Sequence, residues 1–215
     1  LDLDQSIVFP LSDENSYVLP QKMDYYHPYN QTDLHDQRVT ELFRDAIETA
    51  YNDDEIDFSN YDHVVVFHAG IGQDFSLPFL DPTPEDIPST FIDGEMLQEF
   101  VGGVLQFGTS TINQGIILPE TQNHLFYQES ENIFFDTEEP CDYQYGLTGT
   151  FALMLGFAIG LPPLWDTNSG QSGIGIFGLM DQGSNNGRGL IPAPPDAWSR
   201  KFAGWELPSI AVPSK

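Results

Sequence analysis

The sequence predicts an α+β domain with a central buried helix and a small mixed sheet. Three observations lead to this fold class. Residues 32–50 carry apolar side chains at helical spacing, residues 64–67 form a short β-branched and aromatic run, and residues 148–160 are apolar all round. A chain of 215 residues is long enough to bury a sizeable core. We therefore expect one domain over residues 1–215.

The elements near the N-terminus follow from periodicity and turn residues. Residues 1–30 contain three prolines and show neither helical nor strand periodicity, which predicts an extended but ordered lead-in. A helix then begins with Thr32 or Asp33 as its N-cap. One face of this helix is expected to be buried, and the other to be exposed and largely acidic. The buried face comprises Val39, Leu42, Phe43, Ala46, Ile47 and Ala50, and the exposed face Asp36, Glu41, Arg44, Asp45 and Glu48.

Short strands and long loops are predicted for the middle of the chain. Residues 64–67 suit a buried central strand, because they are β-branched or aromatic and are bounded by polar residues and glycine. Residues 70–94 contain four prolines and many acidic side chains, which favours a long surface loop. Residues 104–107 and 115–118 predict two strands that form a hairpin. A second acidic loop is expected over residues 129–142.

The helix over residues 148–160 has no polar face. A helix that is apolar all round is expected to be buried on all sides. Two environments remain open for the side that carries Leu153, Met154 and Phe157. Either neighbouring side chains fill the space beside it, or an apolar groove remains there and binds a peptide or another ligand. Residues 166–196 are rich in glycine, asparagine and proline, which predicts little regular structure.

The charge balance excludes some classes of partner. The formal net charge of −26 comes from 33 acidic and only 7 basic side chains. Nucleic acids and anionic membranes would be repelled by such a protein. The longest nearly apolar run, over residues 151–165, contains two glycines and two prolines and is too short to cross a bilayer. Cys141 is the only cysteine, so no intrachain disulfide forms, and we expect it to be a small buried residue.

Four stretches of the sequence resemble one family of secreted peptidases when they are taken in order. Over roughly residues 35–206 the chain is similar to the immune inhibitor A group of metallopeptidases, the M6 family. The resemblance implies a zincin-like fold of the metzincin type. It rests on Tyr61-Asp62 running through a strand into His68-Ala69-Gly70, on Gly156, Gly160, Leu161, Pro162, Leu164 and Asp166, on residues 173–180 ending in Met180, and on Pro195, Ala197-Trp198-Ser199 and Gly204-Trp205.

The resemblance also locates the places that hold zinc in an active peptidase. The pattern His-Glu-x-x-His puts two imidazoles one helical turn apart, and its glutamate activates the zinc-bound water. Here these ligand and base places hold Leu153, Met154 and Phe157, and the third-ligand place holds Pro163. Gly160, which allows the chain to turn after the helix, is retained. We therefore expect a degenerate M6 domain with no catalytic residues and no zinc, which is not an enzyme.

The expected function is that of a pseudopeptidase in an exported protein. Such a domain, secreted or at the cell surface and part of a longer chain, would bind a polypeptide or serve as a structural unit. A binding groove would include His68, Ala69, Gly70, Phe157 and Met180. Two alternatives remain open: a structural or assembly subunit of an extracellular or cell-surface polymer that associates with itself, and a hydrolase with unidentified chemistry that does not use zinc.

Calcium is the one cofactor that the sequence leaves open. Hard cations bind carboxylates and carbonyls that loops bring together, although no twelve-residue EF-hand spacing occurs. The candidate ligands are Asp136, Asp142, Asp166 and Asp181, and solvated acidic loops are the alternative interpretation. The histidines show no spacing typical of a zinc site, and His68 is expected to be a hydrogen-bonded structural residue.

Overall fold

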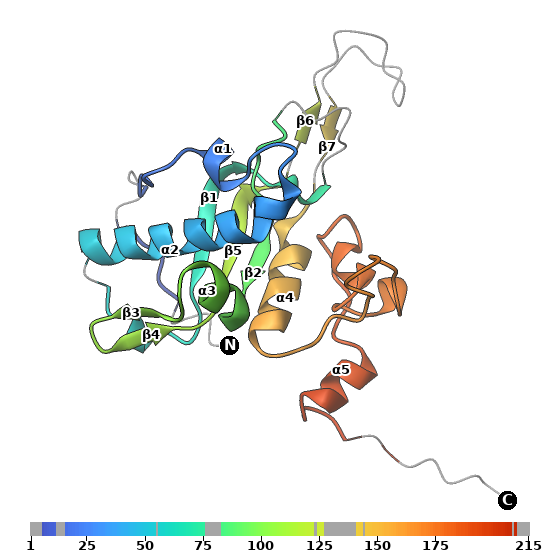
Figure 1. Cartoon of the computed structure of the whole chain (residues 1–215). Helices are drawn as coiled ribbons and strands as arrows, with labels where there is room; N and C mark the ends of the chain where they lie inside the picture. The colour runs from blue at the N-terminus through green and yellow to red at the C-terminus, as the bar shows by residue number, and fades with distance from the viewer. Residues whose placement is uncertain are drawn as a thin grey trace, which may run out of the picture. The chain divides into compact units, whose positions relative to one another are not determined.

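The chain has an α+β fold that divides into two compact units (Figure 1). The computed structural model describes residues 6–11, 16–54, 56–75, 83–122, 124–126, 141–143, 145–207 and 209. Within these residues it has five α-helices, a small mixed sheet and two further strand pairs, which confirms the α+β class. The first unit comprises Leu1–His68 and Thr83–Leu118, and the second comprises Ala69–Pro82 and Pro119–Lys215.

Helix α2 (His35–Asp54) forms as the sequence predicts. A 3-10 turn over Thr32–Leu34 precedes it, and the whole predicted apolar face is buried. Asp45, which we predicted to be exposed, is buried instead. The reason is helix α1 (Met23–Tyr26), a helical turn within the lead-in that was expected to be extended. The Tyr26 hydroxyl donates to Asp45 at 2.7 Å, and Arg44 forms an ion pair with the same carboxylate at 2.7 Å.

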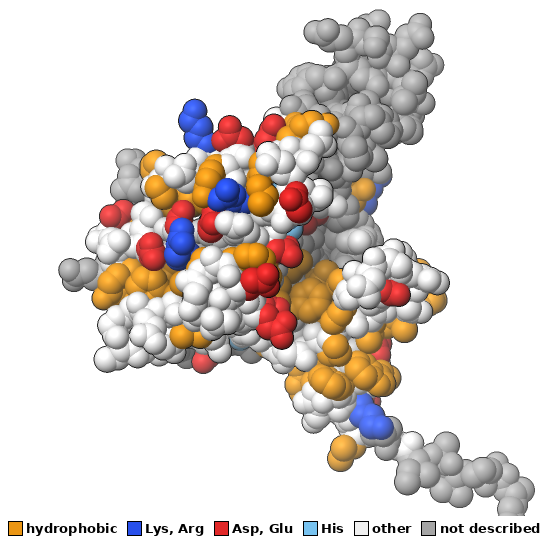
Figure 2. All heavy atoms as spheres, in the orientation of Figure 1, with side chains coloured by type: hydrophobic (Ala, Val, Ile, Leu, Met, Phe, Trp, Pro, Cys, Tyr) orange, Lys and Arg blue, Asp and Glu red, His pale blue; other side chains and the backbone are white. Residues whose placement is uncertain are grey.

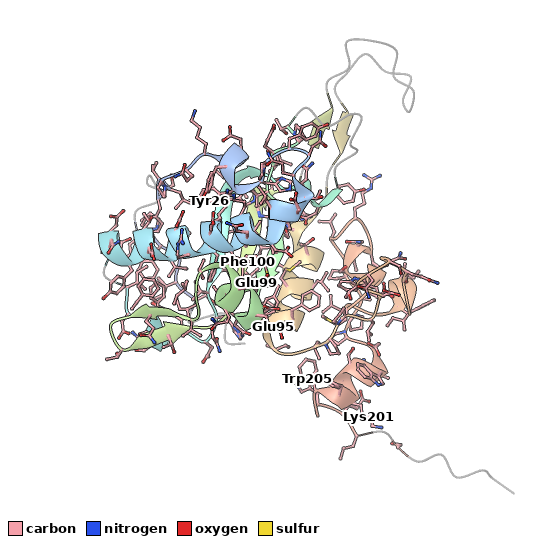
Figure 3. All side chains as sticks on the ribbon, in the orientation of Figure 1. Tyr26, Glu95, Glu99, Phe100, Lys201 and Trp205 are labelled. Atoms are coloured by element: carbon pink, nitrogen blue, oxygen red, sulfur yellow. The ribbon has the colours of Figure 1, made fainter. Side chains whose placement is uncertain are left out.

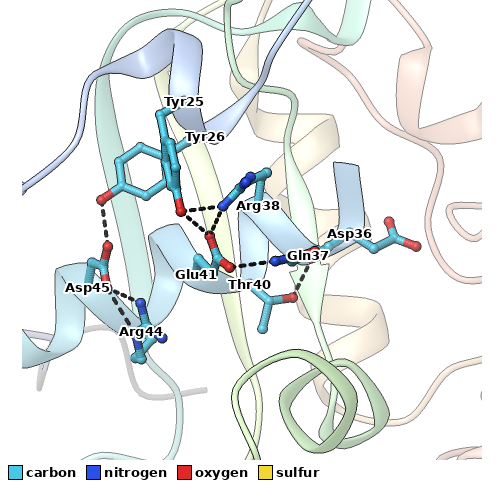
Figure 4. Close-up of polar contacts among 9 residues, drawn as sticks. All are labelled: Tyr25, Tyr26, Asp36, Gln37, Arg38, Thr40, Glu41, Arg44 and Asp45. Atoms are coloured by element: carbon cyan, nitrogen blue, oxygen red, sulfur yellow. Dashed lines mark hydrogen bonds and ion pairs between the residues drawn. The ribbon is translucent and has the colours of Figure 1, made fainter. Parts of the chain in front are cut away.

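A second polar cluster joins α1 to α2 (Figure 4). The Arg38 guanidinium lies 4.0 Å from the centroid of the Tyr25 ring and 2.6 Å from Glu41, while the Tyr25 hydroxyl donates to Glu41 at 2.9 Å. Gln37 donates to the same carboxylate at 2.8 Å. Burial alone would raise the pKa of Glu41, but the hydrogen bonds from these three residues outweigh burial and lower it. The lead-in is therefore held to α2 through charged groups as well as through apolar packing.

Two half-buried histidines meet where α1 ends and α2 begins. The ring centroids of His27 and His35 are 5.5 Å apart with the planes nearly perpendicular. Nδ1 of His27 is buried and has no hydrogen-bond partner among the described residues. Burial lowers the pKa of both imidazoles, and the nearby His35 lowers that of His27 further. The Asp86 backbone and the charges of Asp86 and Glu85 act in the opposite direction on His27, and the charge of Asp36 does so on His35. The native chain therefore favours the neutral form of both rings.

Acid is expected to weaken this junction before it protonates the carboxylates. Because the native pKa of each histidine is lowered, the unfolded chain takes up protons first, and stability falls as the pH drops below about 6.5. The double variant His27→Gln, His35→Gln should lose a few degrees less in melting temperature between neutral pH and weak acid than wild type. His63→Gln, at another half-buried histidine, is the control. Equal acid sensitivity of all three proteins would contradict the expectation.

The three-stranded sheet has the order β1 (Val65–Ile71), β5 (Gly115–Thr121), β2 (Thr90–Ile92). β5 is the buried central strand, and β2 pairs with it antiparallel. Hydrogen bonds from Ile116 N to Val64 O and from Gly72 N to Thr121 O show that β1 runs parallel to β5. The prediction of a buried central strand at residues 64–67 is therefore wrong, because this segment belongs to the half-exposed edge strand β1.

The predicted hairpin is also wrong in its pairing. β3 (Leu105–Phe107) pairs antiparallel with β4 (Ser110–Ile112) across a tight turn, and β5 belongs to the other sheet. Gly108 has φ +59 in this turn, a conformation that favours glycine. The loop expected over residues 70–94 contains β2, and helix α3 (Gly94–Phe100) follows with Asp93 as its N-cap. Together with α2, these elements pack around one apolar core.

The second unit has fewer regular elements. β6 (His124–Phe126) pairs antiparallel with β7 (Cys141–Tyr143), helix α4 spans Leu147–Ala158, and helix α5 spans Ala197–Phe202. Between the two helices lie only the 3-10 turns Gly175–Phe177 and Gln182–Asn185 and one isolated bridge, which confirms the predicted irregular stretch. Most of the expected acidic loop over residues 129–142 lies outside the described residues. No helix in the described ranges is long and apolar enough to cross a membrane.

Candidate functional site

Helix α4 ends in the sharp turn that its sequence predicts. Gly160 has φ +88, and its N–H donates to the carbonyl of Phe157 at 2.8 Å. The N–H of Leu161 reaches back to the carbonyl of Gly156 at 2.9 Å. These two bonds form a Schellman motif, in which glycine adopts the left-handed conformation without a Cβ clash. The chain then returns beside the helix, where Leu164 N donates to Met180 O at 2.8 Å.

The helix is not buried on all sides, so that expectation is wrong. Its buried residues are Gly149, Thr150 and Gly156, whereas the large apolar side chains are only half-buried. The small residues are buried because they allow close approach of other backbone segments. Gly149 N donates to the carbonyl of Gly189 at 2.8 Å, and a Cβ on Gly149 would overlap the carbonyl oxygen of Ser184.

The two predicted ligand places on α4 are occupied by an apolar contact. Leu153 and Phe157, one helical turn apart, pack against a buried cluster of Leu161, Leu179 and Met180. Met180 is fully buried, and its thioether lies where a Cβ on Gly156 would stand. Met180 was expected to line a binding groove, but a fully buried side chain does not line an open groove.

The Phe157 side chain also has an aromatic neighbour. The rings of Phe157 and Trp165 meet edge to face, with centroids 5.8 Å apart and an interplanar angle of 75°. Such aromatic pairs contribute about 0.5 to 1.5 kcal/mol beyond their buried area. Pro163, which the resemblance puts at the third-ligand place, is half-buried and has no side-chain donor atom. This part of the second unit is therefore joined by apolar contacts.

Asp181 organises the segment around Met180. Its Oδ2 accepts hydrogen bonds from Ser172 Oγ at 2.9 Å and, at 2.8 to 2.9 Å, from the backbone N–H groups of three successive residues. Its Oδ1 accepts from Gln182 N at 2.8 Å. The three successive donors are Gly173, Ile174 and Gly175. Burial alone would raise the pKa of Asp181, but the hydrogen bonds outweigh burial and lower it.

The candidate calcium ligands make other contacts where they are described. Asp166 is exposed, and its Oδ1 accepts from the N–H groups of Asn168 and Ser169 at 2.9 and 3.1 Å. A cation at Asp166 or Asp181 would have to compete with these donors. Asp136 lies outside the described residues, and so does the side chain of Asp142 in β7. No group of three or more His, Cys, Asp or Glu that could hold a metal occurs in the described part, and calcium binding stays a prediction.

The remaining predicted site residues lie on β1. His68 Nε2 is 3.0 Å from the carbonyl oxygen of Ile87, which confirms its expected structural hydrogen bond. Ala69 and Gly70 are exposed, and Gly70 N donates to Glu120 Oε2 at 3.2 Å. Phe67, which the sequence analysis did not single out as a site residue, is 56% exposed on the same strand. Because an edge strand shows the same β-branched and aromatic pattern as a central strand, the sequence offered no signal for this exposure.

No family model, curated protein or solved structure matches the chain. The resemblance to the M6 family therefore stays a prediction, and functional inference depends on the geometry of the chain itself. Two features bear on function: the apolar contact of Leu153 and Phe157 with the Met180 cluster, and the half-exposed edge strand β1.

Proposed function

We propose that the chain is a catalytically inactive, M6-like pseudopeptidase domain of an exported protein, which binds an extended polypeptide without cutting it. One observation carries the proposal. Leu153 and Phe157 stand where the resemblance expects two zinc ligands, and both pack against the Met180 cluster.

The chemistry of these side chains supports the absence of peptidase activity. Zinc in proteins is held by imidazole nitrogen, thiolate sulfur or carboxylate oxygen. Leucine and phenylalanine offer none of these, and Pro163 adds no donor in the third place. Met154 stands where an active enzyme has its glutamate, and a thioether does not take up the proton of an attacking water.

The position of β1 supports a polypeptide as the ligand. β1 is an edge strand of the three-stranded sheet and carries the exposed Phe67. Extended peptides add to such edges through main-chain hydrogen bonds, and side chains on the strand contribute selectivity. We place the bound polypeptide alongside β1. A different observation, the exposed aromatic side chains of α5, favours the alternative of a structural or assembly unit.

The test asks whether the protein binds peptides and leaves them intact. Dialysed wild type should hold no stoichiometric zinc by elemental analysis, and mass spectrometry should find peptides selected from an unstructured library uncut. Phe67→Lys should weaken binding of these peptides about tenfold or more, because a charge on an edge strand opposes pairing. Val104→Lys is the matched control, since Val104 is 46% exposed and lies outside the three-stranded sheet.

Three results would contradict the proposal in different ways. One equivalent of zinc that survives dialysis, together with cleavage that a chelator abolishes, would show an active metallopeptidase. Equal peptide binding by Phe67→Lys and Val104→Lys would show that β1 is not the binding site. A wild-type protein that selects no peptide would remove polypeptide binding from the proposal.

A further inference from the structure

Helix α5 has the reverse of the usual amphipathic pattern. Its small residue Ser199 is fully buried, and Ala203, which follows the helix, packs against the Met180 cluster. Its largest side chains point outward, since Trp198 is 51% and Phe202 57% exposed. The two rings stack on each other with centroids 5.2 Å apart and planes 20° apart. Figure 2 shows hydrophobic side chains gathered over α5 with basic atoms beside them.

Hydrogen bonds at both ends of α5 fix the backbone that carries the exposed rings. Asp196 caps the helix by accepting from Trp198 N at 2.8 Å and from Ser199 Oγ at 2.5 Å. Gly204 has φ +74, and Trp205 N donates to the carbonyl of Arg200 at 2.9 Å, which closes α5 with a Schellman motif. Trp205, 54% exposed, is therefore fixed next to the helix, as Figure 3 shows together with Lys201. The backbone that carries these rings would therefore lose little conformational entropy if they were covered.

The charge of this part of the chain differs from that of the rest. Residues 167–207 contain three acidic and three basic side chains, so the net charge of −26 comes entirely from the remainder. Aromatic side chains and a low density of charge distinguish the centre of a protein–protein interface from ordinary surface. Two copies of a strongly acidic chain repel each other least when they approach through such a neutral stretch. The exposed surface of α5 thus has an apolar centre and lies in a stretch without net charge, where two copies of the chain do not repel each other.

We propose that the α5 face, which we define as Trp198, Phe202 and Trp205 with the adjacent Lys201 and Glu206, is the contact surface of a dimer of this chain. A two-fold interface brings the same face of each copy together, so it must be self-complementary. The α5 face meets this condition because it carries both a cation and a carboxylate beside its aromatic centre. Glu206 already forms an ion pair with Arg200 of its own chain at 2.5 Å. In the dimer its carboxylate also pairs with Lys201 of the partner subunit, and the rings cover one another. This inference is independent of the proposed polypeptide binding.

The oligomeric state of the purified chain tests the proposal. Sedimentation velocity over a wide range of concentrations should show a monomer–dimer equilibrium, and added salt should strengthen the dimer by screening repulsion between the acidic copies. Phe202→Glu should raise the dissociation constant about tenfold or more, as expected for a buried aromatic contact. Phe177→Glu introduces the same charge at a side chain that is 79% exposed and lies outside the α5 face, and it should leave the constant unchanged.

A mixing experiment separates a two-fold dimer from binding of any other partner. Lys201→Glu alone and Glu206→Lys alone should each be monomeric, because like charges then meet at both symmetric positions. An equimolar mixture of the two variants should form heterodimers, because both positions again join opposite charges. Circular dichroism should show that every variant remains folded. A wild type that is monomeric at all concentrations, a dimer equally sensitive to both phenylalanine variants, or a mixture that stays monomeric would overturn the proposal.

Discussion

Asp181→Ala is expected to lower the free energy of unfolding by about 1.5 to 3 kcal/mol, because it removes a buried charged acceptor and the hydrogen bonds that hold the segment around it. The Asp181 carboxylate accepts from Ser172 Oγ and from four backbone N–H groups, and it is only 4% exposed. The donor residues are half-buried or exposed, so water replaces part of the lost hydrogen bonding, but it does not restore the single acceptor that joins them. Urea unfolding of both proteins at neutral pH measures the difference.

The control and the pH dependence follow from the same contacts. Asp166→Ala also removes a carboxylate that accepts backbone N–H groups, but Asp166 is exposed and water replaces it, so the effect should be small. Because the native pKa of Asp181 is lowered, its contribution is complete above the ordinary value of about 4 and is lost as the pH falls through the native value. The difference between wild type and Asp181→Ala should therefore shrink in strong acid. Equal losses for the two alanine variants at neutral pH would contradict this account.

Gly149→Ala is expected to destabilise the protein by about 3 kcal/mol, although alanine favours helix more than glycine does. A Cβ at this position would overlap the carbonyl oxygen of Ser184, which belongs to the backbone and moves only if the adjoining turn moves. The hydrogen bond from Gly149 N to Gly189 O fixes the helix against the same segment. Thermal and urea unfolding of the variant measure the loss.

Two other glycines provide a graded comparison. Gly156→Ala would displace the Met180 thioether, a flexible side chain, and should cost less than Gly149→Ala. Gly94→Ala, at the start of α3, has its nearest neighbour at 3.6 Å and should be neutral or slightly stabilising. From the most to the least stable, the expected order of the variants is therefore Gly94→Ala, Gly156→Ala, Gly149→Ala. Equal stability of the three variants would show that α4 is free to move away from its neighbours.

The two long helices, α2 and α4, were more predictable from the sequence than the short helices and the strands. The buried face of α2 and the turn at Gly160 depend on local periodicity and on one residue's backbone preference, and both were predicted. Strand pairing depends on partners that are distant in the sequence. The runs at residues 104–107 and 115–118 had suitable composition for a hairpin, but β4 between them pairs with β3 and leaves β5 for another sheet. Three-residue strands carry too little periodicity to reveal this.

The candidate site was predictable only in part, for a related reason. The apolar residues at the ligand places were visible in the sequence, and so was the position of Met180. The contacts of Asp181 were not, because its donors are mainly backbone N–H groups, which every residue except proline has. The apolar composition of α4 indicated burial, but it did not show how far neighbouring segments cover the helix. The residues of α4 that are buried are the small ones, Gly149, Thr150 and Gly156, whereas its large apolar side chains stay half-buried.

The contact of Leu153 and Phe157 with the Met180 cluster has a consequence for assembly of the second unit. A metal site closes a fold only after its ligands have lost their protons and an ion has been acquired from the surroundings. An apolar contact needs neither, since it forms wherever water is excluded from its surfaces. The packing of Leu153 and Phe157 therefore depends on the exclusion of water, and neither the uptake of an ion nor the deprotonation of a ligand is a step in forming this contact.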